Sequence, residues 1–133
     1  MKMSWEQFEK IVKEIESDLK IDRLNMDEKI LQIPSIKHFW VAELYRSKIQ
    51  IQKLENYKKE RVKELQSTLV TEIGLSKNSL VNQINSDEKI MKINAKLEEL
   101  KIIVEYLEDV KYVMGRVTDD IKNRIELEKV ERL

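Results

Sequence analysis

The residues of this chain whose types and spacing could do chemistry are basic, and most of them lie in its middle. Residues 35–65 carry eight basic and four acidic side chains, although the whole chain has 25 of each and no net charge. Four lysines in this stretch recur at intervals of 11, 11 and 4 residues: Lys37, Lys48, Lys59 and Lys63. On an α-helix this spacing places them within about 80° of one another. Such a row of cations could track the phosphates of a nucleic acid.

An aromatic ring accompanies the row, because Tyr45 falls on the same flank of the expected helix. Cations interleaved with rings suit single-stranded nucleic acid, whose bases stack on aromatic side chains. The residues expected to contact nucleic acid are Lys37, Lys48, Lys58, Lys59, Arg61 and Lys63. The alternative is an ordinary solvated face whose lysines pair with Glu55 and Glu60. The sequence leaves both interpretations open.

A dense aromatic patch, His38-Phe39-Trp40, lies near the start of the same stretch. The patch fits either a core plug between the N-terminal segment and a long helix or a base-stacking platform. His38 is the only histidine and the chain has no cysteine, so neither a zinc site nor a disulfide is expected.

Acidic pairs are frequent, but they do not resemble a catalytic site. Glu98-Glu99, Glu108-Asp109 and Asp119-Asp120 are sequence neighbours, and neighbours on a helix point in different directions. We therefore expect them on solvated faces rather than held apart in a pocket for acid–base catalysis. The chain contains neither a nucleophile elbow nor a phosphate-binding loop. We expect a protein that is not an enzyme and needs no cofactor or metal.

The elements that must position the basic row are helices, since the chain has only two glycines and one proline and 38% of its residues are charged. Ser4 and Gln7 form a capping-box pattern, which predicts a first helix to about Lys20. A short helical turn over 24–31 should follow. We expect Ile33-Pro34 to break it, because the residue before proline avoids the helical region.

Ser35 can cap a long helix over 36–73, with Gly74 as its C-cap. Residues 75–85 are expected to form a loop with a short helix around 79–84. Ser86, followed by two acids, is typical of a helix start, so the last helix should run from Asp87 almost to Leu133. Gly115 interrupts this helix, which indicates close helix packing or a kink.

These elements predict an all-α protein of one domain: an N-terminal helical segment (1–34) and a long helical hairpin (35–133). Each long helix carries an apolar stripe at helical spacing. A lone hairpin should leave much of both stripes wet, so we expect self-association into a coiled-coil-like oligomer. The expected oligomerisation residues are Leu97, Leu100, Val104, Leu107, Met114 and Ile121.

The composition and the N-terminus bear on location. No stretch approaches the roughly 18 uncharged apolar residues that a membrane span requires. The chain begins MKMSWEQFEK, with acids where a signal peptide would be apolar. A cytoplasmic protein is expected, in the host cell if a phage encodes it.

The order of these features resembles phage recombination mediators of the UvsY type. The resemblance covers most of the chain: Ile21-Asp22, the proline-marked segment 33–40, the basic segment 54–63, the segment Ser86–Ile93 that opens the last helix, and Arg116 with Ile121-Lys122. One departure lies in the basic helix. The family has a Lys-x-Arg pair followed by tyrosines, whereas this chain reads Lys63-Glu64-Leu65. Arg61 could substitute in part.

The resemblance implies a ring-shaped homo-oligomer of six or seven subunits with no enzymatic activity. It also implies contacts to single-stranded DNA, to a recombinase and to a single-strand-binding protein. We therefore expect a mediator that helps load a recombinase onto single-stranded DNA in homologous recombination and repair. The alternative is a structural or adaptor coiled coil, such as a phage scaffolding or assembly protein, that does not bind DNA.

Overall fold

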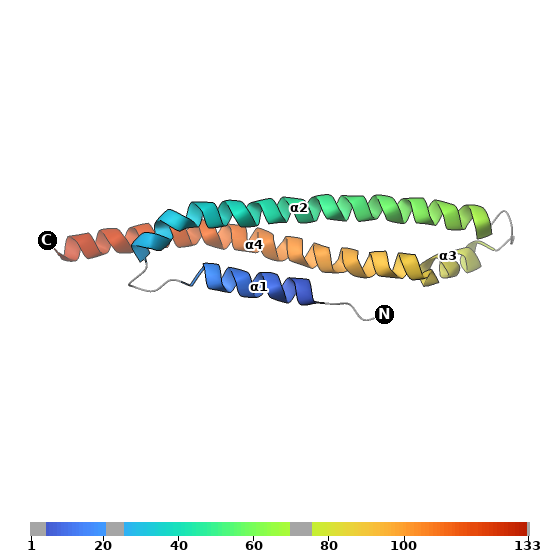
Figure 1. Ribbon diagram of the computed structural model, residues 1–133, viewed down its shortest axis with the longest axis horizontal. Helices are drawn as coiled ribbons and strands as arrows, with labels where there is room; N and C mark the ends of the chain where they lie inside the picture. Colours follow the sequence, from blue (N-terminus) through green and yellow to red (C-terminus); the bar gives the residue numbers. More distant parts are fainter. Residues whose placement is uncertain (1–4, 21–25, 70–75, 133) are drawn as a thin grey trace.

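The computed structural model describes residues 5–20, 26–69 and 76–132. Over these residues the chain forms no strand and has four helices: α1 (Glu6–Asp18), α2 (Met26–Gln66), α3 (Lys77–Ser86) and α4 (Glu88–Glu131). Helices α2 and α4 lie side by side as a long hairpin, α1 lies along part of it, and α3 lies at its closed end (Figure 1). None of the described helices is long and apolar enough to cross a membrane. The expected all-α hairpin is confirmed.

The start of α2 differs from the sequence expectation. Pro34 lies inside α2, so the predicted break at Ile33-Pro34 is wrong, and Ser35 is an interior residue rather than a cap. Proline removes one backbone hydrogen bond and crowds the preceding turn, which bends a helix without having to end it. The first turns of α2 are inclined to the rest of the helix (Figure 1). Ile33 and Ile121 are buried against each other, so packing on α4 holds these turns in place.

The start of α4 is capped by a different residue from the one expected. The Asp87 carboxylate accepts a hydrogen bond from the backbone N–H of Ile90 at 3.2 Å and is the N-cap. Ser86 is instead the last residue of α3, and its hydroxyl donates to the carbonyl of Asn82. The length predicted for the last helix is confirmed. The proposed caps Ser4 and Gly74 lie outside the described residues.

The core lies along the seam between α2 and α4, and α1 covers one side of it. One cluster of buried side chains joins the three helices: Ile15, Trp40, Leu44, Leu100, Ile103, Leu107, Val110 and Met114. Edge-to-face packing of Phe8 on Tyr106, with ring centroids 5.5 Å apart, adds an aromatic contact between α1 and α4. Each fully buried apolar side chain contributes about 1.5–3 kcal/mol to folding.

The residues expected to form the oligomer interface are used inside the subunit. Val104 is half-buried in the single chain. The other five are buried: Leu97, Leu100, Leu107, Met114 and Ile121. The expectation that a lone hairpin leaves this stripe wet is therefore wrong, because α2 and α1 cover it. Apolar side chains of α4 that remain exposed in the single chain include Leu127 and Val130, which are 62% and 65% exposed.

Candidate nucleic-acid interface

Two of the six basic residues singled out in the sequence are fully available to a ligand. Lys59 and Lys63 are exposed on α2 and form no ion pair with any described residue. They are four residues apart, so they lie on neighbouring turns of the same face. Their charges are free to neutralise phosphates.

Lys48 lies on the same helix but has partners. Its ammonium group is 3.2 Å from a carboxylate oxygen of Glu108 on α4 and 5.2 Å from the centre of the Tyr45 ring. All three side chains are substantially exposed, so solvent screens this ion pair. The Lys48 ammonium group can therefore still interact with a ligand while it links α2 to α4.

Arg61 has a structural role in the hairpin. Its guanidinium donates two hydrogen bonds to Asp87, at 2.8 and 3.0 Å, and one to Glu64 at 3.2 Å. These bonds raise the pKa of Arg61, and the Arg61 guanidinium in turn lowers the pKa of Asp87 below its usual range. Because Asp87 also caps α4, Arg61 ties the end of α2 to the start of α4.

Lys58 is less available than the sequence suggests. It is half-buried, and it follows the buried Trp40 by 18 residues, which is five helical turns. Lys58 therefore lies on the same face of α2 as Trp40, where part of its side chain is covered.

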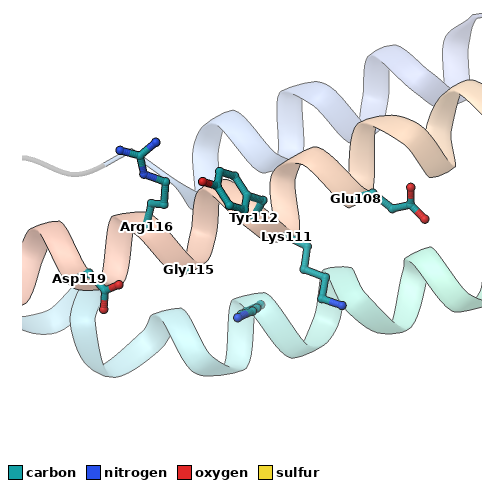
Figure 2. A pocket seen from close by; sticks show the side chains of 7 residues that line it. Glu108, Lys111, Tyr112, Gly115, Arg116 and Asp119 are labelled. Atoms are coloured by element: carbon teal, nitrogen blue, oxygen red, sulfur yellow. The ribbon is translucent and has the colours of Figure 1, made fainter.

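The sixth residue, Lys37, is half-buried and lines a groove between α2 and α4. The groove has a volume of about 460 Å³, and its other lining residues all come from α4: Glu108, Lys111, Tyr112, Gly115, Arg116 and Asp119. Figure 2 shows Lys111 directed toward α2, whereas Tyr112 and Arg116 project on the side of α4 away from α2. Sequence reasoning did not assign Lys111 or Tyr112 to a site. The signal that could have identified them is the spacing of Lys111, Tyr112 and Arg116, which places two cations and a ring within two turns of helix.

The aromatic patch divides between core and surface. Trp40 is buried, and its indole N–H donates to the Asp18 carboxylate of α1 at 2.8 Å, so the core-plug interpretation is confirmed for this residue. Phe39 packs edge-to-face on Trp40 and is half exposed at the clefts between α1 and α2. His38 is exposed.

The acidic pairs also differ from the expectation at one position. Glu99 is buried rather than solvated, and it pairs with Lys96 at 3.2 Å. Lys96 also donates to the side-chain oxygen of Gln7 on α1 at 2.6 Å. This pair therefore helps to hold α1. Over the described ranges no three metal-binding side chains come together.

The fold of this chain is similar to that of a known protein. Solved structures of the bacteriophage T4 recombination mediator protein UvsY, in three lattice types, superpose with TM-scores of 0.77 to 0.81. The similarity covers 92–94% of this chain and 97–98% of the UvsY chains, at 14–15% sequence identity. No protein-family model matches the chain, and no curated protein matches it in sequence. The likeness is therefore one of fold.

Proposed function

We propose that this protein is a single-stranded-DNA-binding recombination mediator that helps load a recombinase and acts without catalysis of its own. The observation that supports this most is the similarity of fold to a recombination mediator over nearly the whole of both chains. The exposed cations of α2 support it independently, because the fold similarity does not depend on their charge.

In the proposed mechanism, Lys59, Lys63 and Lys48 neutralise phosphates of the strand, and Arg61 holds the hairpin closed beside them. A single subunit offers few such contacts. A ring of six or seven copies would add them along one strand, so that binding becomes multivalent. The copies would meet through apolar residues that remain exposed, such as Leu127 and Val130. The held strand would then offer a surface on which a recombinase filament can nucleate.

DNA binding is tested by fluorescence anisotropy of a labelled oligothymidylate titrated with the purified chain. The logarithm of the binding constant should fall linearly with the logarithm of the salt concentration between about 50 and 200 mM, with a slope of about −0.7 for each phosphate contacted. Lys59→Glu combined with Lys63→Glu should weaken binding by about tenfold or more.

The matched control is Lys13→Glu combined with Lys53→Glu. These two lysines are exposed, carry the same charge and form no ion pair with any described residue, but lie off the row. The control should retain binding within about threefold if position matters rather than net charge. Equal loss in both double variants would contradict a defined DNA surface. No binding by the wild-type chain would support a structural or adaptor protein instead.

The mediator role needs its own measurement. We expect the chain to speed assembly of a phage recombinase on single-stranded DNA that a single-strand-binding protein covers, as followed by the lag before strand exchange. The Lys59→Glu/Lys63→Glu variant should restore the lag while light scattering shows the same assembled mass. A wild-type chain that binds DNA without shortening the lag would overturn the mediator role alone.

A further inference from the structure

The groove between α2 and α4 is lined by three cations and an exposed aromatic ring: Lys37 and Lys111 lie where α2 and α4 face each other, and Tyr112 and Arg116 lie on the outer side of α4 (Figure 2). We propose that this groove is a second contact site for single-stranded nucleic acid, in which Tyr112 stacks on a base and Lys37, Lys111 and Arg116 neutralise neighbouring phosphates. This inference rests on the proposed function and adds the face of α4 to the surface of α2.

The charges in the groove favour an anion. Lys37, Lys111 and Arg116 form no ion pair with any residue that the structure describes. Of the two carboxylates that line the groove, Glu108 is already held by Lys48. Asp119 is the one acid lining the groove that has no cationic partner among the described residues. The lining thus holds three cations and one carboxylate that have no partner among the described residues, which leaves it net positive.

The exposed ring of Tyr112 favours single-stranded over duplex nucleic acid. Tyr112 is 68% exposed where it lines the groove. Figure 2 shows its ring on the outer side of α4, near Arg116. An exposed ring beside cations can stack on an unpaired base, whereas the bases of a duplex already stack on one another. The volume of about 460 Å³ lies in the range of small-ligand pockets.

The glycine in α4 keeps the groove open. A Cβ at Gly115 would meet the Lys37 ammonium nitrogen at 4.0 Å and nothing nearer. The helices therefore do not approach closely at this glycine, contrary to one of the sequence interpretations. Instead, the missing side chain leaves space beside the Lys37 ammonium group. A methyl group fits there, whereas the larger leucine side chain would occupy part of the groove.

The groove is continuous with the proposed surface of α2. Glu108 lines the groove and pairs with Lys48, and Lys48 lies over the ring of Tyr45. Lys59 follows Lys48 by 11 residues, which is close to three helical turns on the same face. A strand that leaves the groove at Glu108 therefore meets Lys48 next and then the exposed lysines nearer the closed end of the hairpin.

The test measures binding of the full-length chain to labelled oligothymidylate. Lys111→Ala combined with Arg116→Ala should weaken binding by about tenfold and reduce the salt slope by about 1.4, because two phosphate contacts are lost. Tyr112→Ala should weaken binding between about 5-fold and 100-fold, whereas Tyr112→Phe should keep it, since stacking needs only the ring. Asp119→Asn should strengthen binding.

Arg124→Ala is the matched control, since Arg124 is an exposed arginine of the same helix that does not line the groove. It should leave affinity and salt slope unchanged. As a direct readout, an oligonucleotide with iodouracil should photocrosslink to Tyr112, identified by mass spectrometry. Gly115→Leu should reduce that crosslink.

The outcomes separate this inference from the proposed function. If the wild-type chain binds DNA and only the α2 variants weaken it, the groove is not a contact site but the proposed function stands. If the wild-type chain does not bind DNA, both fail. If the groove variants and Arg124→Ala lose affinity equally, diffuse charge explains the binding and the groove proposal is overturned. Preferential binding of duplex would also overturn it.

Discussion

Two sections of the α2/α4 hairpin are held together in different ways. In the section that α1 covers, apolar side chains from three helices meet in one cluster. Its members include Ile15 of α1, Leu44 of α2 and Leu107 of α4. Figure 1 shows α1 lying along this part of the hairpin and not along the closed end. A third helix lets both long helices bury apolar surface on more than one side.

Toward the closed end, polar contacts join the two long helices in addition to buried apolar side chains such as Ile90 and Leu97. None of the residues of α3 is buried, and Arg61 with Asp87 and Glu55 with Lys101 link α2 to α4. The Glu55–Lys101 pair is largely exposed and contributes little to stability, because water and salt screen it, whereas the Arg61–Asp87 pair is partly buried. The difference teaches that the free lysines of α2 lie apart from the apolar cluster, whereas the proposed groove lies beside it. The section without α1 is also where Lys59 and Lys63 remain free for a ligand.

The largest effect is expected in the apolar section. Leu107→Ala should lower the free energy of unfolding by about 2–5 kcal/mol, because the fully buried side chain leaves a cavity. Urea unfolding followed by circular dichroism measures this. The matched variant Lys59→Ala on the exposed face should change stability by less than about 0.5 kcal/mol. Similar losses in both variants would contradict the distinction between core and surface.

A smaller effect is expected where α1 meets α2. Trp40→Phe keeps a ring in the core but removes the hydrogen bond to Asp18, so unfolding should become easier by about 1–3 kcal/mol. Hydrogen exchange should show the loss of protection in α1 before α4. An unchanged exchange rate in α1 would mean that this bond does not hold the helix.

A gain of stability is expected at the groove. Gly115→Ala should stabilise the chain by about 0.5–1 kcal/mol, because alanine is a better helix former and the added methyl group makes only an ordinary contact. Thermal unfolding measures the gain. A loss of stability would show that the backbone at this position needs glycine.

The smallest effect is expected at the closed end, and only in acid. Arg61 lowers the pKa of Asp87, so the stability from this carboxylate is present at neutral pH and is lost as pH falls through the lowered pKa, below about pH 4. Hydrogen exchange of α3 and the start of α4 should rise there. In Asp87→Asn this part of the pH dependence should disappear, while other carboxylates still titrate. An equal acid response in both chains would contradict the assignment.

Much of the fold could be predicted from local pattern. The apolar spacing of the last helix and the acids at its start predicted α4 almost to its ends, since both signals act over a few residues. Pro34 was misjudged because its local effect is overridden by packing of Ile33 on Ile121. Of the candidate site, the sequence predicted Lys59 and Lys63, which are exposed in the structure. The groove was not, because it needs Lys37 and residues of α4 that lie more than 70 positions later.

By itself, the sequence determined that this chain is helical, that it has two long helices and that an excess of basic residues lies in the first of them. Those properties follow from composition and from a period of about 3.6 residues, which each segment carries alone. Only the tertiary structure decided that the apolar stripe of α4 is covered within the chain, that Arg61 bonds Asp87, and that Lys37 lines one groove with Lys111 and Arg116. The reason is physical: a stripe or a charge does not specify its partner, and the partner is selected when distant segments pack.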